Sequence, residues 1–148
     1  MKFTRQHMVN MAREYKGVPY RHQGRSKANG VDCAGLLALI ADRIGLEYPD
    51  DLRYPRNPEK FNLKPVMDKV LRPIPKPDIR PGDVLLFKID IVPQHVAIAA
   101  DYTHGGLSMI HCYDRVGKVV EHRFANIWMS RLVQGYQLPG IEEAIDGN

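Results

Sequence analysis

The period of the hydrophobic pattern changes once along this chain, at Pro81, and this change restricts the folds open to it. Before Pro81, residues 5–16 and 33–44 carry apolar side chains at helical spacing, with Thr4 as a cap and with Gly17 and Gly45 as stops. After Pro81, apolar residues alternate, which predicts short strands over 84–87, 95–99, 107–113, 118–122 and 132–138. Helices followed by sequential strands are typical of an α+β domain with an antiparallel sheet.

The length favours one domain. A chain of 148 residues can bury a single core, and we expect the domain over residues 1–140 with a polar tail over 141–148. Residues 49–81 hold eight of the eleven prolines, which predicts an irregular segment with one short helix near 67–71. This segment is a candidate for shaping specificity or binding a partner.

Composition excludes several classes of protein. No apolar run reaches the length of a membrane span, and the first residues lack the apolar stretch of a Sec signal, which predicts synthesis in the cytoplasm. The net charge of +4 is spread along the chain without a basic block, so no nucleic-acid partner is expected. A solvated surface and a general attraction to a polyanion both remain open. The two cysteines form neither a disulfide framework nor a C-x-x-C pair.

Cys33 has the sequence setting of a reactive cysteine. Asp32 is a good helix cap, which places Cys33 in the first turn of the second helix, where unpaired N–H groups and the helix dipole favour a thiolate and lower its pKa. Gly35 in the same turn permits another backbone to approach closely. A buried cysteine that serves only as a small apolar residue is the alternative.

A cysteine nucleophile needs a base and a group that orients the base. Alternation places His95 on one face of its strand, with Ala97 and Ala99, and it places His111 on one face of the next strand, away from Cys112. If these strands are neighbours, both histidines can meet on the face that receives the Cys33 helix. Cys112 then belongs to the core.

The remaining histidines have less specific interpretations. His104 lies in a predicted hairpin turn, and His122 follows Glu121 on a strand where it could face either way. A metal site built from His95, His111 and His122 is conceivable, but no ligand spacing supports it, so we expect no metal and no cofactor.

Three motifs give the chain a resemblance to the NlpC-type family of bacterial cell-wall cysteine peptidases, a papain-like group, over about residues 5 to 139. They are the segment from Gly17-Val18-Pro19-Tyr20 to Gly30-Val31-Asp32-Cys33-Ala34-Gly35-Leu36, the segment Arg80-Pro81-Gly82-Asp83-Val84-Leu85-Leu86-Phe87 with His95-Val96-Ala97-Ile98, and Met109-Ile110-His111. The resemblance implies a papain-like core and a Cys-His-His triad with Cys33 as nucleophile, His95 as base and His111 orienting it.

The resemblance also implies a substrate and a pocket. Family members cleave peptide stems of peptidoglycan, commonly between D-glutamate and a diamino acid. The implied substrate-binding positions are Tyr20, Asp32 and Ala34, and the main-chain N–H of Cys33 is a natural oxyanion donor. For Tyr20, a buried aromatic residue of the loop is an equally good interpretation.

The sequence departs from the family at Ala34, where Ser is usual, at Gln23, where Gly is usual, and at Ala97, where Gly is common. These departures affect substrate fit more than the chemistry. A single domain without wall-binding repeats resembles phage-encoded versions, which implies a virion-associated enzyme with phage tail proteins as partners. The rival functions are an acyltransferase or another amide hydrolase of the same fold, a catalytically idle phage-tail assembly module, and a metal-binding protein.

Overall fold

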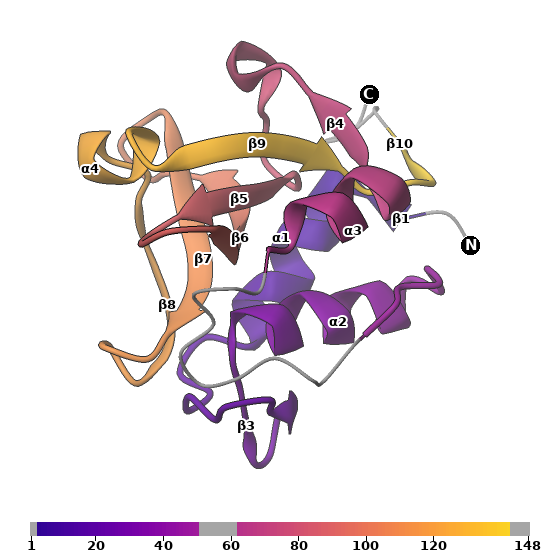
Figure 1. The fold of residues 1–148 in the computed structure, drawn as a ribbon, viewed down its shortest axis with the longest axis vertical. Coiled ribbons are helices and arrows are strands. Elements are labelled where there is room, and N and C mark those ends of the chain that lie inside the picture. Colours follow the sequence, from indigo (N-terminus) through magenta and orange to yellow (C-terminus); the bar gives the residue numbers. More distant parts are fainter. Residues whose placement is uncertain (1–2, 51–61, 143–148) are drawn as a thin grey trace.

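The computed structural model describes residues 3–50 and 62–142, and it has an α+β architecture in which helices α1 and α2 lie on one side of a six-stranded antiparallel sheet (Figure 1). The helices are α1 (Arg5–Glu14), α2 (Cys33–Arg43), α3 (Lys64–Val70), α4 (Asn126–Met129) and the 3-10 turn η1 (Lys76–Asp78). The sheet contains β4 (Arg72–Ile74), β5 (Val84–Lys88), β6 (Pro93–Asp101), β7 (Leu107–Tyr113), β8 (Lys118–Arg123) and β9 (Leu132–Gln137). Short strands β1 (Phe3–Thr4) and β10 (Ile141–Glu142) pair with each other, as do β2 (Arg25–Ser26) and β3 (Gly30–Val31).

Both predicted N-terminal helices are present, and each begins at its predicted cap. The Thr4 hydroxyl accepts from the His7 backbone N–H, and the His7 ring accepts from the Thr4 N–H, which forms a capping box. The Asp32 carboxylate accepts from the Gly35 N–H at 2.8 Å and starts α2. Their apolar faces pack into one core cluster, to which α1 contributes Met8 and α2 contributes Leu36.

The order of strands in the sheet is β4-β9-β5-β6-β7-β8. Strands β5 to β8 follow one another as the alternation predicted, but β9 returns across the molecule and inserts between β4 and β5 (Figure 1). The segment expected to be irregular also supplies β4, which carries Pro73. Proline is tolerated there because β4 is an edge strand and pairs only with β9. Part of the predicted irregular segment, residues 51–61, lies outside the described residues.

The sheet splits between β6 and β7 at one end. Their pairing runs from Ile98 opposite Ile110 to Asp101 opposite Leu107. Before Ile98, β6 pairs with β5, and after Ile110, β7 pairs with β8. The first half of β6 therefore presents a backbone edge to the split.

The two faces of the sheet are covered differently, and this corrects one expectation. Val96, Ile98, Ile110 and Cys112 face α1 and α2, as the predicted alternation requires, with Cys112 in the core. The histidine face, which also carries Phe87, is the opposite one, and it is filled by Phe124 and by Trp128 of α4 rather than by α1 or α2. The expectation that the histidines meet on the helix-covered face is wrong, because the larger β-branched side chains of the other face form the core with the helices.

Two strands tie the ends of the described chain together. Phe3 lies opposite Ile141, and Thr4 lies opposite Glu142, in a parallel pair. The described fold therefore continues two residues past the expected domain boundary at 140, and the rest of the expected tail lies outside the described residues. No helix in the described residues combines the length and the apolar character needed to cross a membrane.

Candidate active site

Asp32 holds the loop that precedes Cys33. Besides capping α2, its carboxylate accepts from the Gln23 backbone N–H at 2.8 Å and pairs with the Arg25 guanidinium at 3.1 Å. Gln23 has a φ of 59°, in the left-handed region, which explains why glycine is favoured at this position. A side chain at Gly35 would collide with the Gly24 carbonyl, so the predicted close approach of two backbones at the helix start is present.

Cys33 sits at the split edge of the sheet. In β6, the Ala99 N–H donates to the Asp83 carbonyl, and the Ala99 carbonyl accepts from the Gly82 N–H. Both groups of Ala99 therefore point toward β5 and the turn before it. Because backbone groups point to alternate sides along a strand, those of Gln94 and Val96 point toward the split. The Cys33 thiol donates to the Gln94 carbonyl at 3.7 Å. Cys33 thus lies against the two residues that flank His95 in sequence.

The pKa of the Cys33 thiol is raised to about 12, and not lowered as the helix-start position predicted. Burial is the main cause and the charge of Asp32 is the second, while the N–H groups of Val96 and Ala34 act in the opposite direction. The capping carboxylate that starts the helix thus opposes the helix dipole. Near neutral pH, Cys33 is therefore a thiol and not a thiolate.

Three histidines form a continuous hydrogen-bonded chain. His95 Nε2 lies 2.7 Å from His111 Nδ1, and His111 Nε2 lies 2.7 Å from His122 Nε2. His122 Nδ1 lies 2.9 Å from the Arg123 carbonyl oxygen, where the chain ends. The predicted partnership of His95 and His111 is therefore present, and the chain continues one ring further. His122 was left open by the sequence, and the β7–β8 register brings it onto the face of His111.

Trp128, on α4, covers this chain. Its ring centroid lies 5.7 Å from His95, 5.1 Å from His111 and 5.9 Å from His122. Sequence reasoning assigned Trp128 no role, because nothing in its local pattern brings α4 across the sheet. The tryptophan and Tyr113, which also contacts His95 and His111, exclude water from the rings. His95 is 4 % exposed and His111 is 1 % exposed.

The spacing of the histidines suits hydrogen bonds rather than a shared metal ion. Two nitrogens bound to one tetrahedral Zn²⁺ lie about 3.3 Å apart, since each Zn–N bond is about 2.0–2.1 Å long. The nitrogens of neighbouring rings here lie 2.7 Å apart. Across residues 3–50 and 62–142, no group of three or more His, Cys, Asp or Glu residues has a metal-binding arrangement.

The other residues named by the resemblance are also near the start of α2. Tyr20 forms a bridge with Val31, its N–H donates to the Gly117 carbonyl at 2.8 Å, and its side chain packs on the same core cluster as Cys33. Ala34 directs its backbone N–H at the Cys33 sulfur. Asp32 is 5 % exposed and engaged within the protein. Substrate contacts of these three residues remain predictions.

The two inner histidines make the stability of the protein dependent on pH. Burial is the main cause that lowers the pKa of His95 to about 3 and that of His111 to about 2. Between about pH 6.5 and 3, the unfolded chain binds protons that the folded chain excludes, so the free energy of unfolding falls as the pH falls. The limiting loss is about 1.4 kcal/mol per pH unit for each ring.

Urea denaturation at pH 7.5, 6.0 and 5.0 measures this loss. Carboxylates with ordinary or lowered pKa contribute little to the change in stability between pH 7.5 and 5.0. His95→Gln is expected to remove roughly half of the pH dependence of the free energy of unfolding, because one of the two buried rings is gone. Equal stability at pH 7.5 and 5.0 would contradict neutral burial of the rings.

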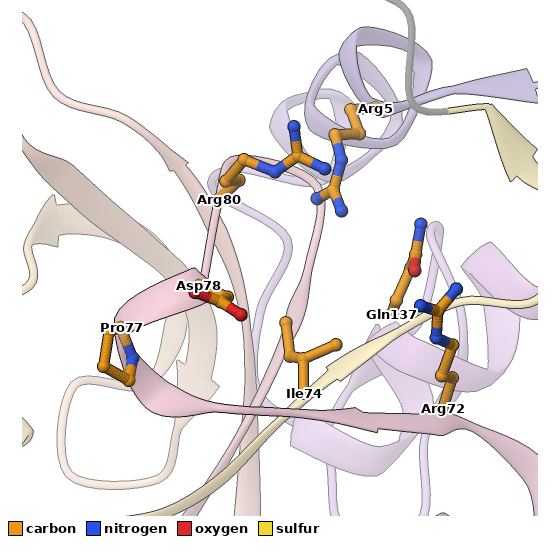
Figure 2. A pocket seen from close by; sticks show the side chains of 7 residues that line it. All are labelled: Arg5, Arg72, Ile74, Pro77, Asp78, Arg80 and Gln137. Atoms are coloured by element: carbon orange, nitrogen blue, oxygen red, sulfur yellow. The ribbon is translucent and has the colours of Figure 1, made fainter.

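A separate cavity of about 420 Å³ lies at the other edge of the sheet from β8. It is lined by Arg5, Arg72, Ile74, Pro77, Asp78, Arg80 and Gln137 (Figure 2). The side chains of Arg5 and Arg80 lie beside each other there, and Arg72 reaches toward Gln137. The Arg5 guanidinium is bound to Asp83 at 2.6 Å and donates to the Pro81 carbonyl. None of the residues around Cys33 lines this cavity.

Solved structures of other proteins share this fold. One is an NLP/P60 family protein from Staphylococcus aureus described as similar to lipoprotein, with a TM-score of 0.68 and 19% identity, covering 97% of this chain and 44% of that chain. Another is an NlpC/P60 family protein from Bacillus cereus, with a TM-score of 0.70 and 19% identity, covering 96% of this chain and 42% of that chain. The NlpC/p60 domain of the peptidoglycan hydrolase SagA has a TM-score of 0.63 at 20% identity, covering 91% of this chain and 99% of that one.

The chain thus spans less than half the length of the first two structures, and these likenesses show the papain-like fold. No curated protein matches. Residues 17–137 match the NlpC/P60 family, a range that includes Cys33, the three linked histidines and Trp128. The chain belongs to the NlpC/P60 family.

Proposed function

We propose that this protein is a cysteine hydrolase that cleaves amide bonds in peptidoglycan stem peptides, at the bond between D-glutamate and a diamino acid. The observation that carries this proposal is the pair of hydrogen bonds from His95 through His111 to His122, behind a cysteine held at the edge of β6. A nucleophile, a base and an orienting group are the parts that such chemistry requires. The substrate class comes from the family and from the SagA peptidoglycan hydrolase domain.

The reaction proceeds by acyl transfer. Because Cys33 is protonated and His95 is neutral, His95 takes the thiol proton as the sulfur attacks the amide carbon. The N–H of Cys33, at the start of α2, donates to the oxyanion, and Tyr20 contributes to the pocket. The C–N bond then breaks, and His95 returns its proton to the leaving amine.

Water completes the cycle. His95 removes a proton from a water molecule, whose oxygen attacks the thioester carbon and displaces the Cys33 sulfur. The sulfur regains the proton from His95, and the acid product leaves. Burial lowers the pKa of His95, so the ring is neutral near pH 7 and can accept a proton. These steps consume one water and need no cofactor.

The test is digestion of purified peptidoglycan, with mass spectrometry of the released fragments. We expect paired products, with a new D-glutamyl carboxylate on one fragment and a free amine on the other. Protein alkylated with iodoacetamide is the control and should release none. If the untreated protein releases no fragments from several peptidoglycan types, the proposed hydrolase function is wrong, and an idle module of the same fold takes its place.

The same experiment separates hydrolysis from acyl transfer to an amine. Added glycinamide would appear in the products of an acyltransferase, because the thioester is common to both reactions, whereas a hydrolase forms the free acid. A virion-associated role with phage tail partners remains a prediction from the sequence alone, and it concerns where the enzyme acts rather than which bond it cuts.

A further inference from the structure

The outermost ring of the histidine chain ends on a group that can only accept a hydrogen bond. The Arg123 carbonyl oxygen lies 2.9 Å from His122 Nδ1, so this nitrogen carries the proton. A neutral imidazole has one N–H, which leaves His122 Nε2 as an acceptor. This single backbone oxygen therefore sets the tautomer of His122.

The same constraint passes inward through the chain. His111 Nε2 lies 2.7 Å from the acceptor on His122 and must donate to it, so His111 Nδ1 becomes an acceptor. His95 Nε2 lies 2.7 Å from that acceptor and must donate in turn. His95 Nδ1 is then left with a free lone pair, which is the form of the ring that can take a proton from Cys33.

Packing holds the three rings in this arrangement. Trp128 contacts every ring of the chain, and the two inner rings are almost fully buried. The rings come from β6, β7 and β8, whose backbones are fixed by the sheet. The middle ring, His111, is 1 % exposed and cannot turn over without breaking its hydrogen bonds to both His95 and His122.

We propose that His122 is a positioning residue that fixes His95 in the tautomer with Nδ1 unprotonated, acting through His111 from the Arg123 carbonyl. This inference rests on the proposed function in taking His95 as the base. It adds that the base is oriented by a chain of two further histidines, and that the polarity of this chain is set by the backbone of β8.

The test compares wild type with His122→Phe and His122→Gln, and a fourth protein serves as the control. Phenylalanine keeps a ring against Trp128 but can neither accept from His111 nor donate to Arg123. Glutamine can do both, because its amide carries an acceptor oxygen and donor hydrogens. His104→Phe, in the exposed β6–β7 turn, is the matched control for loss of a histidine.

The first measurement is ¹⁵N NMR of the His95 ring, which reports its tautomer without any substrate. We expect the Nε2–H form in wild type and His122→Gln, and a mixture of both forms in His122→Phe. A wild-type His95 protonated at Nδ1, or an unchanged Nε2–H form in His122→Phe, would overturn the proposal. This result does not depend on peptidoglycan being the substrate.

The second measurement is kinetic. His122→Phe should lower both kcat and the rate of Cys33 alkylation by iodoacetamide at least about tenfold, with KM within about twofold, since the loss falls on proton transfer. His122→Gln should recover to within about threefold of wild type, because its amide can make both hydrogen bonds. Equal losses in the two variants would indicate a merely structural role. Failure of wild type to cleave peptidoglycan, with the alkylation pattern intact, would remove the proposed substrate but not the positioning role.

Discussion

Replacement of Cys33 with alanine is expected to abolish peptidoglycan cleavage, with a loss of at least about four orders of magnitude in kcat. The thiol is the nucleophile of the proposed reaction, and it lies against the backbone on both sides of His95. Because Cys33 packs against the core cluster from the first turn of α2 and is not part of it, its replacement should leave the fold intact. Fragment release measured by mass spectrometry, together with a thermal melt, checks both statements.

Cys112→Ala is the matched control for the loss of a thiol. Cys112 is 1 % exposed, lies on the helix-covered face of the sheet, and donates to the Val31 carbonyl at 3.1 Å. Its replacement should cost about 1 kcal/mol of stability through the lost hydrogen bond, while activity remains. If Cys33→Ala keeps measurable turnover, or if Cys112→Ala loses it, the nucleophile has been assigned to the wrong cysteine.

The second large effect concerns stability. The Arg5 guanidinium and the Asp83 carboxylate form an ion pair at 2.6 Å, with side chains 3 % and 1 % exposed. Burial raises the pKa of Asp83, even though the Arg80 backbone and Arg5 both stabilise its charge. Arg5→Met takes the guanidinium away from a buried carboxylate, so it should lower the free energy of unfolding by about 3–5 kcal/mol.

A double-mutant cycle tests this explanation. Asp83→Leu should cost a similar amount, but the double variant Arg5→Met/Asp83→Leu should be more stable than either single variant, because neither charge remains buried. Arg43→Ala, which breaks the exposed pair with Glu14, is the control and should cost at most about 1 kcal/mol. Denaturant titration at pH 7.5 measures wild type and the four variants. Additive losses at Arg5 and Asp83 would contradict a coupled pair.

The parts of this fold that depend on local spacing could be predicted from the sequence. Alternation located β5 to β8, and the caps Thr4 and Asp32 located the starts of α1 and α2, because these features depend on residues a few positions apart. The insertion of β9 between β4 and β5 could not be predicted in this way, since it pairs Gly135 with Ile74 and Leu85, far away in sequence.

The candidate site was likewise predictable only where it depends on residues close together in the sequence. Residue type and alternation identified Cys33, His95 and His111, but not which face of the sheet each helix covers. The face that a helix covers depends on how the whole helix layer packs against the whole sheet. The contact of Trp128 with the histidines depends on the same packing, because it brings α4 across the sheet. The raised pKa of Cys33 was also missed, because the sequence reasoning weighed the helix dipole and not the burial of the thiol.

The position of β9 also bears on how the protein is made. A ribosome that adds roughly 5–20 residues per second synthesises Leu132 some seconds after Val84. During this interval β5 has one edge without its final neighbour, and β4 has no partner in the sheet. Unpaired strand edges invite pairing with other chains, and non-local pairing is slow. The sheet that holds the three histidines can therefore close only after the chain has been made through Gln137.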